Sequence, residues 1–81
     1  MSRTVHDSIV MVVTQKLGHY PATANENWLV HVALANAVLI LACGGNTPQE
    51  RCERAAAEVT RLCDIHSAGS KVEIMSLPVS A

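Results

Sequence analysis

A thiol and an imidazole, Cys63 and His66, are the two side chains whose spacing best suits metal binding. Three residues apart on a helix, they lie about one turn apart and could share a soft or borderline metal ion with a ligand from a neighbouring subunit. In the simpler interpretation, Cys63 is a small buried apolar residue and His66 faces the negative end of the helix dipole. Two ligands without a second pair form a weak pattern, so this interpretation is favoured and no cofactor is predicted.

The remaining thiols add little chemistry. Cys52 and Cys63 share one stripe of a predicted helix but lie roughly 16 Å apart along its axis, too far for a common ion or a disulfide. Cys43 and Cys52 flank the Gly44-Gly45 turn and are the one pair that could meet within the chain. Three is an odd number of cysteines, so we expect free thiols in a reducing cytoplasm.

The sequence shows no catalytic constellation. His6, Asp7 and Ser8 are neighbours in the chain, whereas the three roles of a hydrolase triad require spatial and not sequential adjacency. The stretch 43–46 (CGGN) lacks the lysine and the serine or threonine that complete a phosphate-binding loop. We therefore predict that the protein is not an enzyme.

Composition points to one small domain that does not bind nucleic acid. Six Lys and Arg oppose seven Asp and Glu, and the resulting net charge of −1 lacks the cationic excess that phosphate backbones require. Hydrophobic residues make up 49% of the 81 residues and charged residues 16%. A domain of this length has marginal stability alone, and association is a common remedy.

Glycine and proline divide the chain into three predicted helices followed by a C-terminal segment. The helices are expected at about 4–17, 24–43 and 48–68. A strand is the alternative for the first, because residues 9–13 are rich in β-branched side chains. Residues 70–79 alternate in polarity but contain Pro78, which is typical of an edge strand or an extended tail.

Local signals support the second and third helices. Thr23 and Glu26 form the sequence pattern of a capping box, and Thr47 followed by Pro48 is a typical helix start. Gly44 is expected to end the second helix in a left-handed conformation. Because only a few residues separate these helices, we predict an all-α fold, in which a central apolar helix forms an antiparallel hairpin within a three-helix unit.

The central segment 24–43 has no polar face after Asn27, so something must cover it. Its apolar part, 28–43, falls short of the roughly 20 apolar residues that span a bilayer, and it contains His31 and Asn36, so a membrane span is disfavoured. Two short neighbours cannot enclose every side of it, and a second copy of the chain is the simplest third layer. The expected interface of this dimer or higher oligomer consists of His31, Leu34, Asn36, Val38 and Leu41.

These observations lead to two functional hypotheses. The first is a small, non-enzymatic binding or adaptor module that associates with itself and takes a protein or small ligand as a further partner. The second is a metal-binding or metal-sensing protein that uses Cys63, His66 and a ligand from a neighbouring subunit.

Overall fold

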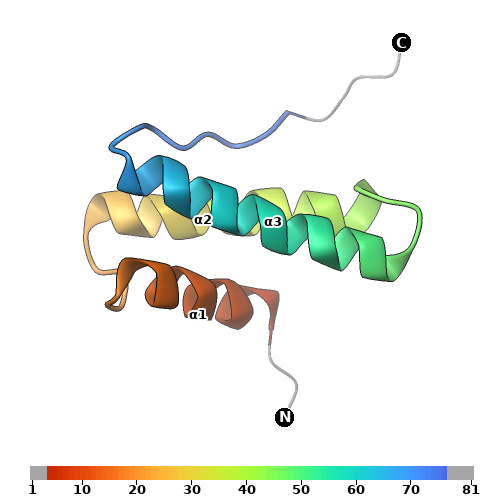
Figure 1. Ribbon diagram of the computed structural model, residues 1–81, viewed down its shortest axis with the longest axis horizontal. Coiled ribbons are helices and arrows are strands. Elements are labelled where there is room, and N and C mark those ends of the chain that lie inside the picture. Colours follow the sequence, from red (N-terminus) through yellow and green to blue (C-terminus); the bar gives the residue numbers. More distant parts are fainter. Residues whose placement is uncertain (1–3, 77–81) are drawn as a thin grey trace.

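The computed structural model describes residues 4–76 and contains three helices in that range: α1 (Val5–Leu17), α2 (Ala24–Cys43) and α3 (Pro48–Ser67) (Figure 1). The prediction of an all-helical fold is confirmed, and the segment from residue 5 to 17 is a helix and not a strand. Residues 70–76 are extended, and no strand occurs between residues 4 and 76. Pro78 lies outside the described residues.

Each helix is preceded by an N-cap threonine whose hydroxyl accepts a hydrogen bond from a free backbone N–H. The side chains of Thr4, Thr23 and Thr47 accept hydrogen bonds, at 3.0–3.1 Å, from the main-chain N–H three residues further along. At Thr23 the expected capping box is complete, because its own N–H donates to Glu26 Oε1 at 3.1 Å. Such caps are worth about 1 kcal/mol each, so local sequence fixes where the helices start.

Glycines end α1 and α2 for two different reasons. Gly18 adopts the left-handed conformation, with φ of 83°, which favours glycine because it has no Cβ. Gly44 was expected to do the same, but its φ is −89°. It is required instead by crowding, because a Cβ at this position would lie 2.7 Å from Ile40 Cγ2 and 2.8 Å from the Ile40 carbonyl oxygen.

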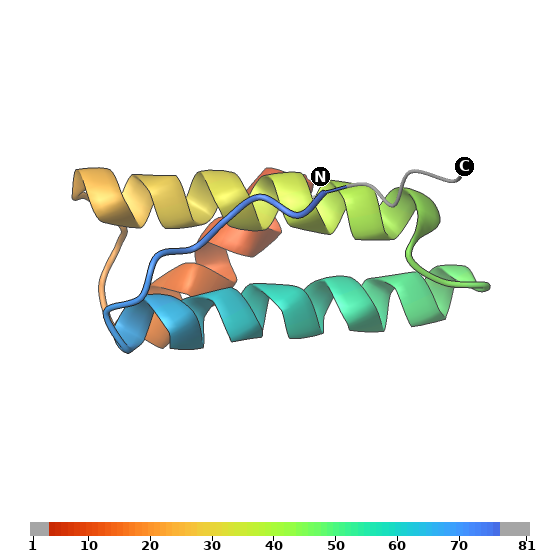
Figure 2. The same cartoon turned by 90° about the horizontal axis from the view of Figure 1, so that it is seen from above.

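The α2 and α3 helices lie side by side, with the chain reversing direction between residues 44 and 47 (Figures 1 and 2). The two views agree that α1 packs on one side of this pair and the extended segment on the other. Small and medium apolar side chains fill the space between the helices. The largest fully buried apolar side chains are Val13, Leu29, Val32 and Leu62.

This arrangement covers only one side of α2. Leu29, Val32, Ala33 and Ala37 face α3 and its neighbours and are buried. In an α-helix the residues about half a turn away point in the opposite direction, and here they have no covering element within the described chain. The side of α2 away from α3 is therefore the first surface to consider for function.

Candidate functional site

The side of α2 away from α3 carries a stripe that contains no Lys, Arg, Asp or Glu, which we call the α2 face: Trp28, His31, Ala35, Val38 and Ala42. Ala35 is half-buried and the other four are exposed. Their spacing of three and four residues places them on one side of the helix. Trp28 is 42% exposed and Val38 is 51% exposed, and they are the two large apolar residues of α2 that are exposed. The ring of His31 stacks on that of Trp28, with centroids 5.3 Å apart.

The residues expected at an interface are divided by the structure into three groups. His31 and Val38 are exposed on the α2 face. Leu34 and Leu41 are half-buried and pack against the core of the same protomer. The prediction that Asn36 lies at the interface must be corrected, because Asn36 has no exposed surface and cannot contact a partner while the protomer is intact.

Asn36 is instead the centre of a hydrogen-bond network inside the chain. Its Nδ2 donates to Glu58 Oε2 on α3 at 2.9 Å and to the main-chain oxygen of Glu73 at 3.3 Å. Its Oδ1 accepts from the main-chain N–H of Met75 at 2.9 Å. Both amide hydrogens and one lone pair are therefore used, which satisfies a polar group that would be costly to bury alone.

An ion pair holds the α3 side of this network in place. Arg61 donates from Nε and Nη2 to the two carboxylate oxygens of Glu58, at 2.8 and 2.7 Å. The hydrogen bonds from Arg61, and secondarily from Asn36, lower the pKa of Glu58 below its ordinary value, although burial opposes them. Glu58 is thus a charged acceptor that fixes the orientation of the Asn36 amide.

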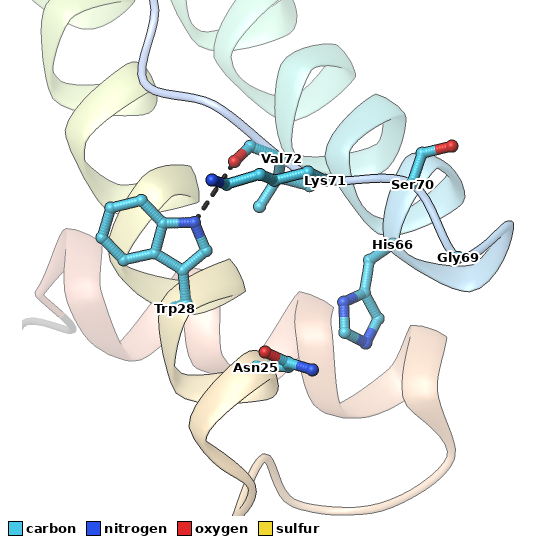
Figure 3. Close-up of a pocket in the computed structure, with 7 residues that line it drawn as sticks. All are labelled: Asn25, Trp28, His66, Gly69, Ser70, Lys71 and Val72. Atoms are coloured by element: carbon cyan, nitrogen blue, oxygen red, sulfur yellow. Dashed lines mark hydrogen bonds between the residues drawn. The ribbon is translucent and has the colours of Figure 1, made fainter.

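A cleft of about 320 Å³ opens where the extended segment leaves α3 (Figure 3). Trp28 and Asn25 line it from α2, and His66 points into it from the end of α3. The Trp28 indole Nε1–H donates to the main-chain oxygen of Val72 at 3.2 Å. Trp28 therefore belongs to the α2 face, where it stacks on His31, and its indole N–H also binds the extended segment.

The thiol and imidazole that sequence spacing suggested for a metal lie in different environments. Cys63 is buried in the hydrophobic core, where desolvation raises the pKa of its thiol, whereas His66 lines the surface cleft. Metal binding favours a thiolate, so a raised pKa works against it. Within residues 4–76 no group of three or more His, Cys, Asp or Glu side chains could hold a metal ion.

The other two thiols lie at the surface. Cys43 and Cys52 are exposed and, like Cys63, are free. The pair that could have met across the glycine turn is therefore not joined. Within residues 4–76 the structure thus contains no disulfide.

Sequence reasoning missed three residues that organise this region: Trp28, Glu58 and Val72. Glu58 resembles any charge on the outer face of an amphipathic helix, and Val72 resembles any apolar residue of a tail. Their roles depend on contacts with α2 across 22 and 44 residues of chain. In the sequence, the available signal was a tryptophan at the start of a run, 28–43, that contains no Lys, Arg, Asp or Glu.

The length and hydropathy of α2 leave a membrane as a competing environment. It is the one helix in the described residues that could cross a membrane by these criteria, with a mean hydropathy of 1.5 over an 18-residue window. One third of that window is buried within the protomer. Core helices of soluble proteins meet the same criteria. The α2 face could therefore be covered by protein or by lipid.

No protein-family model matches the chain, and no curated protein and no solved structure shows significant similarity to it. The geometry of this chain is therefore the basis for inferring its function.

Proposed function

We propose that the protein is a small, non-enzymatic helical module that associates with itself through the α2 face. The observation that carries this proposal is the α2 face itself, an exposed stripe that includes Trp28 and Val38 and contains no Lys, Arg, Asp or Glu. Exposed apolar patches on small soluble proteins mark interaction sites. The exposed surfaces of α1 and α3, by contrast, carry charges such as Lys16, Arg54 and Asp64, although α1 also exposes Val5 and Met11.

The order of residue sizes along the α2 face suits an antiparallel pair of helices. With a two-fold axis near Ala35, Trp28 of one protomer meets Ala42 of the partner subunit, and His31 meets Val38 of the partner subunit. A large residue then lies against a small one at each end, which allows close helix packing. The alanines let the two backbones approach, and no Lys, Arg, Asp or Glu is desolvated in the process.

The mass of the protein in solution, measured by light scattering, tests this proposal. We expect at least a dimer at micromolar concentration. Val38→Glu should yield a monomer of unchanged helicity, because a carboxylate on the face cannot be buried without a partner. Ala57→Glu is the matched control, since it places the same charge at an exposed position on α3, and it should keep the wild-type mass.

Two outcomes would contradict the proposal. A wild-type protein that remains monomeric and soluble at micromolar concentration would show that the α2 face needs no partner. Val38→Glu and Ala57→Glu variants with equal, wild-type mass would place the interface elsewhere. Val32→Glu should unfold the protein, because Val32 is completely buried, and it separates loss of association from loss of the fold.

A lipid bilayer is the competing cover for the α2 face. We favour a second copy because α2 contains Glu26 and the hydrogen-bonded Asn36, and because its other side is occupied by the protomer's own core. Sedimentation with phospholipid vesicles discriminates between the two. Protein that requires detergent to stay in solution and sediments with vesicles, but loses that property in Val38→Glu, would favour the bilayer.

The metal-binding alternative gains no specific support from the geometry. It requires Cys63 to leave the core and a further ligand to come from another subunit. Metal analysis of protein purified without chelator tests it directly. A stoichiometric soft metal that is lost in both Cys63→Ala and His66→Ala would establish it in place of the self-association module.

A further inference from the structure

The extended segment 70–76 runs between α2 and α3, on the side opposite α1 (Figure 2). The helix residues around it include Trp28, Asn36, Arg61, Leu62 and Ile65, and we call the surface that they form the groove. The segment forms no regular secondary structure, and its neighbours in the groove are side chains of the helices. The groove therefore binds an extended stretch of the protein's own polypeptide chain. What the groove recognises can be deduced from the contacts.

The polar contacts between the groove and the segment are made to main-chain atoms. Trp28 donates to the carbonyl oxygen of Val72, and Asn36 donates to that of Glu73 and accepts from the N–H of Met75. A side-chain amide that pairs with a carbonyl and an N–H two residues apart can bind any extended peptide, because every peptide presents these groups. Glu58 and Arg61 hold the amide in the required orientation.

The side chains of the segment contribute much less. Val72 is the one apolar side chain of residues 70–76 that is buried, with 4% of its surface exposed. Ile74 and Met75 are 47% and 36% exposed, so two large apolar residues remain partly in water. The segment is anchored by one aliphatic side chain and by its backbone.

The segment also leaves the groove incompletely filled. A cavity of about 400 Å³ lies between it and α3, lined on the helix side by Arg61, Leu62 and Ile65. The cleft of about 320 Å³ beside Trp28 and His66 lies at the start of the same segment (Figure 3). A peptide with larger side chains could occupy this space and still make the same main-chain hydrogen bonds.

We propose that the groove between α2 and α3 is a binding site for an extended segment of a partner protein that places an aliphatic side chain where Val72 lies. Residues 72–75 occupy this site as an internal competitor. The partner replaces their main-chain contacts with Trp28 and Asn36 and fills more of the cavity beside Arg61. This site shares Trp28 with the α2 face but no other residue of that face, and neither proposal requires the other.

Hydrogen exchange of the wild-type protein tests whether the segment can leave the folded helices. The N–H of Met75 should be at least 10-fold less protected than the N–H groups of Val32 and Leu62, because local release exposes it without unfolding the core. Equal protection at all three positions would mean that the segment opens only when the whole protein unfolds, and it would overturn the proposal.

Peptide binding to full-length variants tests recognition directly. The probe is a fluorescently labelled synthetic peptide with the sequence of residues 70–76 (SKVEIMS), followed by fluorescence anisotropy. Val72→Asp should weaken the internal competitor and lower the apparent Kd for the peptide at least 10-fold relative to wild type. Adding Asn36→Leu should reverse that gain, and a peptide with Asp in place of its valine should not bind.

Three further results would overturn the proposal. The first is a folded Val72→Asp variant that fails to bind the peptide at millimolar concentration. The second is binding that Asn36→Leu leaves unchanged. If Val72→Asp does not fold, Val72→Ala serves in its place with the same expectations, and the exchange measurement on wild type decides independently.

The third result concerns a different occupant of the groove. In the Val38→Glu background, association through the α2 face is removed, so a dimer that remains must use another surface. If a further Val72→Asp change dissociates that dimer, the occupant is the corresponding segment of a second copy, and the assignment to a partner protein is overturned. Loss of the α2 face interaction alone leaves the peptide experiment unaffected, so the two proposals can fail separately.

Discussion

The side-chain oxygen of Asn36 accepts a hydrogen bond from the main-chain N–H of Met75 at 2.9 Å, across 39 residues of chain. Asn36 lies in the middle of the most apolar helix, where an unpaired amide would be destabilising. The contact explains why the amide is tolerated there, since the extended segment and Glu58 together satisfy it. One buried side chain thus joins α2, α3 and residues 73–75.

Asn36→Asp should destabilise the protein by about 2–4 kcal/mol. The substitution removes both amide hydrogens and places a second carboxylate beside Glu58, so that repulsion adds to the lost hydrogen bonds. Urea unfolding monitored by circular dichroism measures the change. Asn46→Asp, at an exposed position in the loop that connects α2 to α3, is the matched control and should change stability by less than about 0.5 kcal/mol. Equal effects at the two positions would refute the role given to Asn36.

Stability should fall in acid because of Glu26. Hydrogen bonds from the Ala22 N–H, from His19 and from the Thr23 N–H lower the pKa of Glu26 from 4.5 to about 2. A carboxyl group with a depressed pKa stabilises the fold fully above its unfolded value, and the contribution is lost as the pH falls through its folded value. The loss should therefore occur between about pH 4.5 and pH 2.

Glu26→Gln tests this assignment, because it removes the titrating group and keeps the side-chain length. The variant should show a flatter dependence of unfolding free energy on pH between about 4.5 and 2 than the wild type. Glu53→Gln, on the exposed surface of α3, is the control and should retain the wild-type slope. An unchanged slope in Glu26→Gln would show that other groups cause the acid sensitivity.

Two of the three thiols should react rapidly with a disulfide reagent at pH 8. Cys43 and Cys52 are exposed, whereas Cys63 is buried and burial raises its pKa, which lowers the fraction of reactive thiolate. Absorbance of the released thiolate counts the reacting groups, and addition of denaturant should make all three accessible. Rapid reaction of three thiols in the native protein would place Cys63 outside the core.

The same burial predicts unequal costs for replacing the cysteines. Cys63→Ala should cost about 1 kcal/mol, because it removes a small apolar group from a packed core. Cys43→Ala and Cys52→Ala should each remain within about 0.5 kcal/mol of wild type. Thermal unfolding of the three single variants provides the comparison.

Gly44→Ala should destabilise the protein by about 1–3 kcal/mol, and Gly45→Ala by less. The new Cβ at position 44 would meet the Ile40 backbone at 2.8–2.9 Å, and backbone atoms cannot move aside without disturbing the end of α2. At position 45 the nearest atom belongs to the flexible side chain of Glu50, at 2.9 Å, which can rotate away. Denaturant unfolding should rank the two variants in this order, and the reverse order would disprove the crowding at Gly44.

Local chemistry made the helices predictable from sequence. Thr23 and Glu26 lie within four residues of each other, and so do Thr47 and Glu50, so the hydrogen bonds that start α2 and α3 depend on few neighbours. The largely apolar sequence of α2 also predicts that two short neighbouring helices leave one of its sides open. The sequence places Gly44 correctly at the end of α2 but suggests the wrong cause, because crowding with Ile40 has no sequence signature.

Tertiary structure alone decided what the polar and thiol side chains do. Asn36 faces inward because α3 and the extended segment meet on its side of α2, and its partners lie 22 to 39 residues away in the chain. Cys63 is buried and His66 lines the surface cleft because one turn of α3 spans the boundary between core and surface. Sequence periodicity records which residues share a side of one helix, but which sides meet depends on the packing of all elements at once.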